Sequence, residues 1–250
     1  PEFHMKRLLA AGSGSIYQIC KAFRQGERGS QHNLEFTMLE WYQLDYDHHQ
    51  LMNQFDELLQ TVFQFKPAKK IGYQAVFEQY CQINPLTAEV DQLKALAAKH
   101  QLSNTPGLAQ ADKDAWLNLI MSHIIEPNLG HSQPQFIYDY PASQAALAKI
   151  NPKNPKVAER FELYIKGKEI ANGFHELTDA NEQRTRFEYA AKQRIERGLT
   201  SPPIDEYFLS ALQHGLPHCS GIAVGIDRLM MVVLGEGDIS LVKSFPIDRA

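Results

Sequence analysis

Residues 23–42, FRQGERGSQHNLEFTMLEWY, join a loop rich in charged side chains to a strand that carries a carboxylate among large apolar side chains. Because successive side chains of a strand point to opposite faces, Phe36, Glu40 and Tyr42 share one face. A lone buried carboxylate costs several kcal/mol unless it meets a cation or hydrogen-bond donors. Taken alone, Glu40 is more often paired with a structural arginine or placed at a solvated strand end. The alternative is that this face lines a cleft in which a cationic ligand supplies the missing charge.

The pattern around this strand predicts an α+β fold with antiparallel strand pairs and segregated helices. Strands are expected at 15–24 and 34–42, in QFIYDYP and RFELYIKGKEIANGF with a tight turn at Lys166-Gly167, and in CSGIAVG. Helices are expected at 1–11, 46–65, 179–198 and 204–214, and directly after CSGIAVG. Three further helical patterns between 74 and 126 predict a helical insertion, about residues 74–130, in an otherwise undivided chain.

The composition of the 250-residue chain is that of an ordinary globular protein, with 44% hydrophobic and 22% charged residues. The net charge of −4 argues against a protein whose main task is gripping nucleic acid through a basic surface. Cys20, Cys81 and Cys219 fit no metal or disulfide spacing, so we expect neither structural zinc nor a disulfide framework, and a reducing cytoplasm. Neither a signal peptide nor a membrane-spanning run is found, and no membrane partner is expected.

A second candidate site lies in KEIANGFHELTD, residues 168–179. Glu169 and Glu176 are seven residues apart, which would place them on opposite faces of a regular strand. A bulge at Gly173 would bring both to one side. Two carboxylates and the Asn172 amide would then suit a hard divalent cation such as Mg²⁺. The commoner outcome for any such pair is two surface glutamates on an edge strand.

A third candidate lies in SGIAVGIDRLMM, residues 220–231, where a glycine-punctuated strand runs into a helix. Such a turn lets the backbone approach a flat or phosphorylated ligand closely. Arg228 could meet a triphosphate with its planar guanidinium. The alternative is an ordinary helix start, in which Asp227 favours the helix dipole and Arg228 is solvated.

Taken in order, the arginine-bearing loop, the aromatic strand, the paired glutamates and GIDR resemble the core of class II aminoacyl-tRNA synthetases. The segment FRQGE…HNLEFTMLEWY resembles their second signature motif and GIAVGIDRL resembles the third. PEF, HNLEFTM and EIANGFHEL are similar to the lysyl-tRNA synthetase branch. Within it the chain resembles the shorter elongation factor P–lysine ligase family, also called GenX or PoxA. Three features favour this family. The segments EFTMLEWY and ASQAALA resemble it, no anticodon-binding module is found, and Ala223 stands where lysyl-tRNA synthetases usually have glycine.

The resemblance covers residues 1–250 and implies an antiparallel sheet flanked by helices. The first signature motif, which carries the dimer interface, would lie upstream of PEFHMKRLLAAG, so we expect an incomplete chain and a homodimer for the full-length protein. The implied activity is ATP- and Mg²⁺-dependent activation of lysine or (R)-β-lysine as an aminoacyl-adenylate, followed by transfer to a lysine side chain of elongation factor P. Two alternatives are a lysyl-tRNA synthetase core that charges tRNA and a non-catalytic amino-acid-binding regulator. A regulator would be free to lose Arg24, Glu169, Glu176 and Arg228, which are all present.

The resemblance also implies residue roles. Arg24 and Arg228 would be catalytic. Nucleotide contacts would come from Arg24, Gln25, Gly26, Glu27, His32, Asn33, Phe36, Glu169, Ile170, Gly225 and Arg228. Amino-acid contacts would come from Glu2, Glu40, Tyr42, Asn172, Glu176 and Ala223, and metal contacts from Glu169 and Glu176. The chain departs from the family at Gly26, where a glutamate is usual, and has Glu27 next to it.

Overall fold

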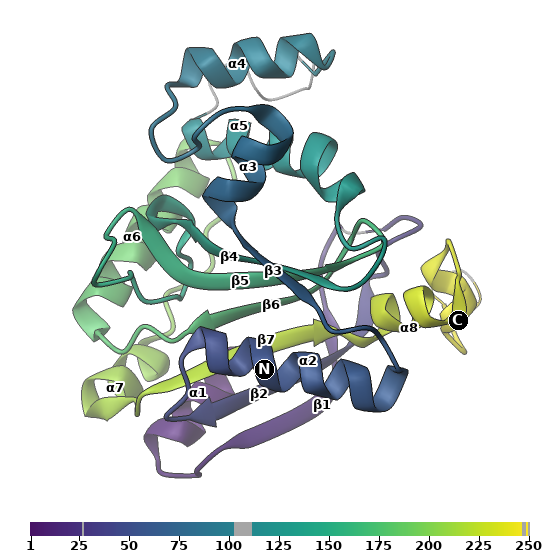
Figure 1. Ribbon diagram of the computed structural model, residues 1–250. Helices are drawn as coiled ribbons and strands as arrows, with labels where there is room; N and C mark the ends of the chain where they lie inside the picture. Colours follow the sequence, from purple (N-terminus) through teal and green to yellow (C-terminus); the bar gives the residue numbers. More distant parts are fainter. Residues whose placement is uncertain (27, 103–111, 247–248, 250) are drawn as a thin grey trace.

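A single sheet organises the chain, and the computed structural model describes residues 1–26, 28–102, 112–246 and 249. Within these residues the sheet has seven strands in the order β1-β2-β7-β6-β5-β4-β3 (Figure 1). The strands are β1 Ile16–Phe23, β2 Glu35–Leu44, β3 Lys69–Gly72, β4 Gln135–Pro141, β5 Val157–Ile165, β6 Lys168–His175 and β7 Cys219–Gly225. Neighbouring strands pair antiparallel except β3 and β4, which are parallel. The expected α+β sheet of a class II synthetase is confirmed.

One face of the sheet is closed by the helix α2, His48–Phe63. Asp47 and Gln50 form a capping box at its start, and the buried Leu51, Phe55 and Leu59 recur at a spacing of four. These side chains pack on apolar residues of the central strands, including Leu39, Trp41, Phe161, Ile222 and Val224. Because strand residues alternate, the neighbours of these residues in β2 and β7 face the opposite side, which stays open as a cavity.

The remaining helices cover the ends and one edge of the sheet (Figure 1). They are α1 Glu2–Ala10, α3 Tyr73–Cys81, α4 Val90–Lys99, α5 Lys113–Ile120, α6 Ala180–Glu196, α7 Glu206–Gly215 and α8 Ile226–Leu234. Helices α3, α4 and α5 share an apolar cluster with residues of β4, next to the β3 edge of the sheet, while α1 and α7 pack together beside Tyr42. The four short helical turns are η1 Met121–Ile125, η2 Glu126–Asn128, η3 Ala142–Gln144 and η4 Ile239–Val242. Of the helices described, none is long and apolar enough to cross a membrane.

Two details of the sheet differ from expectation. Strand β3 was not foreseen, because its four residues carry too little alternation to read. The bulge in β6 lies at Ile170 and not at Gly173, since Leu163 pairs with Ala171 and the next residue of β5 with Glu169. Gly173 instead pairs regularly, and a Cβ there would overlap the Phe161 ring. The expected turn between β5 and β6 is confirmed, with positive φ at Lys166 and Gly167.

Candidate active site

Strands β2, β7 and β6 form the floor of a cavity of about 550 Å³ on the face opposite α2. Most of the residues expected from the sequence line it: Glu2, Arg24, His32, Asn33, Phe36, Glu40, Tyr42, Glu169, Ile170, Asn172, Glu176, Ala223, Gly225 and Arg228. Gln25 and Gly26 lie in an exposed turn outside the lining, and Glu27 lies outside the described residues. The candidate sites of the three sequence segments therefore converge on one cavity.

The bulge explains why one strand presents Glu169 and Glu176 to the same cavity. Beyond Ile170 the even-numbered Asn172 and Glu176 face the cavity, whereas before it the odd-numbered Glu169 does. The two carboxylates nevertheless stand at opposite ends, because six regular strand steps amount to about 20 Å. We therefore expect one ion to contact only one of them, and the joint metal site stays a prediction.

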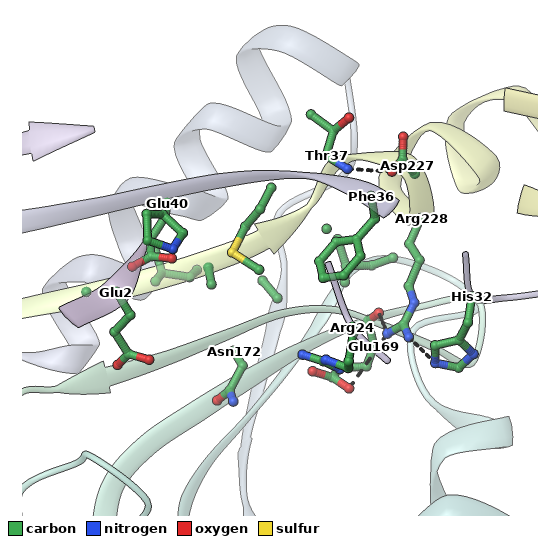
Figure 2. Close-up of a pocket in the computed structure, with 18 of the residues that line it drawn as sticks. Glu2, Arg24, His32, Phe36, Thr37, Glu40, Glu169, Asn172, Asp227 and Arg228 are labelled. Carbon is green, nitrogen blue, oxygen red and sulfur yellow. Dashed lines mark hydrogen bonds and ion pairs between the residues drawn. The ribbon is translucent and has the colours of Figure 1, made fainter. Parts of the chain in front are cut away.

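One end of the cavity holds Arg228 in a fixed position (Figure 2). Its guanidinium donates to the backbone carbonyl oxygens of Glu169 at 3.2 Å and Gln31 at 3.3 Å, and it also contacts the His32 ring. The Glu169 carboxylate lies 3.8 Å from the guanidinium, and the Arg228 side chain is only 23% exposed. The alternative of a solvated Arg228 is therefore wrong.

Arg24 and Phe36 lie at the same end (Figure 2). The Arg24 guanidinium is 5.7 Å from the centre of the Phe36 ring, and the Arg24 side chain is exposed at the mouth of the cavity. The Thr37 N–H donates to Asp227 at 2.7 Å, which ties β2 to the start of α8. An aromatic face and two guanidiniums suit a ligand with a flat ring and several negative charges.

The other end gathers the carboxylates of Glu2, Glu40 and Glu176. Glu40 is only 3% exposed and accepts a hydrogen bond of 2.6 Å from the Tyr42 hydroxyl. Gly221 leaves room for this arrangement, because a Cβ there would overlap the Tyr42 ring and the Glu176 carboxylate. No local pattern indicates this steric role of Gly221.

A buried lysine that was missed at the sequence level belongs to this end. Lys6 is 1% exposed, and its Nζ lies 2.7 Å from Glu2 Oε1 and 2.6 Å from Glu176 Oε2. Its spacing of four residues from Glu2 was the available signal, since side chains at i and i+4 share one helix face. With Glu40 included, three carboxylates face this one lysine. The balance of charge leaves room for a further cation.

Burial shapes the protonation of both ends. It raises the pKa of Glu176 to about 8, against the opposing effect of Lys6, and it also raises the pKa of Glu40. At the other end, burial and the neighbouring Glu162 carboxylate raise the pKa of Glu169 to about 7. A cation that entered either end would favour the ionised carboxylates.

Comparison with known proteins identifies the family of the chain. The family of class II tRNA synthetases (D, K and N) matches residues 1–249, and the chain belongs to this family. Over all 250 residues it is 51% identical to a protein of Klebsiella pneumoniae and 52% identical to one of Salmonella dublin, and it covers 77% of each. Both are named elongation factor P–(R)-β-lysine ligase. Within the class, the chain therefore groups with these ligases.

Proposed function

We propose that the chain is an ATP-dependent ligase that activates lysine or (R)-β-lysine as an adenylate and transfers it to a lysine side chain of elongation factor P. The observation that carries this proposal is the division of a single cavity into two ends of opposite charge. Arg24 and Arg228 stand at one end with an aromatic ring, and three carboxylates stand at the other. Such a cavity suits a polyanionic nucleotide beside a small molecule with an ammonium group.

The carboxylate end would bind the amino acid. In their ionised forms Glu2, Glu40 and Glu176 exceed the charge of Lys6, so an incoming ammonium group would favour these ionised forms and pair with them. Asn172 and Ala223 are register partners on β6 and β7, between the two ends, where they would border the substrate backbone. In this arrangement the substrate carboxylate points toward the arginines.

The arginine end would bind ATP and carry the first step. An oxygen of the substrate carboxylate attacks the α-phosphorus, the bond to the β-phosphate oxygen breaks, and pyrophosphate leaves. Arg24 and Arg228 neutralise the charge that develops on the phosphoryl oxygens, and Phe36 would hold the adenine ring. Catalysis would come from positioning and charge neutralisation without a general acid–base pair.

In the second step the neutral amine of an acceptor lysine attacks the carbonyl carbon of the adenylate. The amide bond forms, the bond to the phosphate oxygen breaks, AMP leaves, and the amine gives up a proton. The partly open Arg24 end of the cavity would admit the acceptor side chain. Elongation factor P is proposed as acceptor because the similar proteins carry it in their names.

Mg²⁺ fits the arginine end. Glu169 faces the cavity there, and its pKa is raised first by burial and then by the neighbouring Glu162 carboxylate, so a divalent cation would favour its ionised form. When bound with ATP, the ion would neutralise triphosphate charge. We propose Glu169 as the metal contact and assign Glu176 to the amino acid.

We also propose that the full-length protein is a homodimer. The edge strand β1 presents Tyr17, Ile19 and Phe23 to solvent at exposures of 75%, 61% and 74%. An apolar edge strand is a surface that proteins usually cover. Light scattering on the full-length protein would measure its mass.

Acyl transfer offered to two acceptors side by side tests the proposed activity. Purified protein is given ATP, Mg²⁺ and radiolabelled lysine or (R)-β-lysine, together with elongation factor P and lysine tRNA. Label on elongation factor P alone supports the proposal. Label on tRNA alone would make the chain a lysyl-tRNA synthetase core. The absence of both acyl transfer and ATP–pyrophosphate exchange would leave the amino-acid-binding regulator.

A further inference from the structure

A second cluster of titratable side chains lies on the opposite face of β6 from the cavity. His175 precedes Glu176, so its side chain points away from the amino-acid end and toward α2. There it meets His48, the first residue of α2, and Glu159 of β5. One ligand atom from each of these three residues lies within 4.8 Å of the others. All three side chains are buried.

The cluster contains buried polar atoms whose hydrogen bonds are unmet. The His48 side chain is 4% exposed, and neither of its ring nitrogens has a hydrogen-bond partner among the described residues. The Oδ1 atom of Asp139 is also buried without a hydrogen-bond partner among the described residues, and it lies 3.4 Å from His48 Nε2. An unsatisfied buried polar group typically costs about 1–3 kcal/mol, so two at one place call for an explanation.

We propose that His48, His175, Glu159 and Asp139 bind one zinc ion. Two imidazoles and two carboxylates form a nitrogen and oxygen donor set that suits Zn²⁺, and four protein ligands are typical of a closed structural site. The ion would bind one of the two orphaned ring nitrogens of His48 together with the orphaned Oδ1 of Asp139. Two carboxylates with neutral imidazoles also match the charge of a divalent cation.

The surroundings of His175 favour a metal ligand. His218 Nε2 lies 2.8 Å from His175 Nε2 and fixes the orientation of the ring, as partners outside a ligand shell commonly do. His218 is exposed, so the cluster lies close to solvent and an ion has a short way in.

A purely structural hydrogen-bond chain is the competing explanation. Glu159, His175 and His218 satisfy one another without a metal. That chain, however, does not include His48, whose ring nitrogens make no hydrogen bond among the described residues and whose Nε2 lies 3.4 Å from the Oδ1 atom of Asp139. The expectation of no structural zinc came from cysteine spacing alone, which cannot detect a site built from histidines and carboxylates of α2, β4, β5 and β6.

Metal content and thermal stability of tag-free protein test the proposal. The protein is dialysed against a chelator, reloaded with Zn²⁺ and desalted, and bound zinc is then measured by elemental mass spectrometry. We expect about one zinc ion per chain, a higher Tm with zinc than without, and visible absorption of a tetrahedral site when Co²⁺ replaces zinc. A wild-type protein that retains no zinc and shows no rise in Tm would overturn the proposal.

Variants locate the ion. His48→Ala and Asp139→Asn should lose the bound zinc and the rise in Tm, and the milder Asp139→Asn keeps the test valid if His48→Ala folds poorly. His218→Ala should weaken zinc binding by about 10–100-fold. His49→Ala is the matched control, because His49 is the exposed neighbour on the same helical turn and should keep full binding. Equal loss in His49→Ala, or full zinc binding in a folded Asp139→Asn and His48→Ala, would contradict the site. Glu169→Gln should keep its zinc, which separates this ion from any ion bound with ATP.

Discussion

Lys6 Nζ lies 2.6 Å from Glu176 Oε2, and both side chains are 1% exposed. The protein thus carries its own cation in the pocket proposed for a cationic substrate. Glu40 has no such partner at hydrogen-bond distance and relies on the Tyr42 hydroxyl. Of the buried carboxylates, Glu40 is therefore the one whose charge is least compensated by the protein. We expect the substrate ammonium group to lie nearest to it.

Lys6→Met should destabilise the protein by about 3–5 kcal/mol above about pH 8, where the fully buried Glu176 is ionised and would lack its partner. Urea unfolding measures this loss. The double variant Lys6→Met/Glu176→Gln removes both charges and should recover part of the stability. If the double variant is as unstable as the sum of the single ones, the pair is not coupled and Lys6 acts through packing alone.

Arg24→Ala and Arg228→Ala should each lower ATP–pyrophosphate exchange with the fold intact. Both guanidiniums would neutralise charge on the triphosphate, and the loss of one such contact typically raises the barrier by about 3–4 kcal/mol. Circular dichroism controls for folding. Exchange near the wild-type rate in a folded Arg24→Ala protein would contradict the assignment of the nucleotide end.

Glu169→Gln and Glu176→Gln should differ, because the two carboxylates stand at opposite ends of the cavity. Glu169→Gln should weaken the apparent affinity for Mg²⁺ and leave the KM for lysine nearly unchanged. Glu176→Gln should raise the KM for lysine and leave the Mg²⁺ titration unchanged. Kinetics over both titrations in both variants provide the measurement. Parallel shifts would mean that the two glutamates serve a common ion.

Lysine binding should release a proton and strengthen as the pH rises toward 8. Burial raises the pKa of Glu176 from 4.5 to about 8, so the folded protein holds a proton there that the unfolded chain gives up near pH 4.5. This group therefore lowers the stability of the ligand-free protein as the pH rises through that window. Calorimetry in buffers of different ionisation enthalpy measures the released proton. The proton release should vanish in Glu176→Gln, and a release that persists there would assign it to another group.

Ala223→Gly should shift the preference from β-lysine toward α-lysine. Ala223 pairs with Glu40 on one side and Asn172 on the other, so its methyl group stands between the two ends of the cavity. Discrimination by about one methylene is worth roughly 1–3 kcal/mol, so we expect a changed ratio with activity retained and some charging of tRNA. Rates with both amino acids and both acceptors decide this. An unchanged ratio accompanied only by lower stability would leave Ala223 a packing residue.

The sheet could be predicted because its strands alternate strongly or end at readable turns, as β5 does before Lys166-Gly167. Local pattern could not predict Lys6, because a lysine on an amphipathic helix reads as exposed and its burial depends on Glu176 far along the chain. Local pattern also could not place the bulge. Gly173 was the expected position, but its missing side chain makes space for the Phe161 ring instead. The histidine cluster escaped for the same reason: its members come from separate strands and a helix.

The bulge at Ile170 reverses the alternation of side chains within β6. Before the bulge the odd-numbered residues face the cavity, and after it the even-numbered residues do, so the strand consists of two segments of opposite phase. A deletion of Ile170 would restore one phase and turn either the nucleotide end or the amino-acid end away from the cavity, while every other side chain of the lining keeps its identity. An inherited or engineered gain or loss of one residue here would therefore uncouple adenylate formation from amino-acid choice.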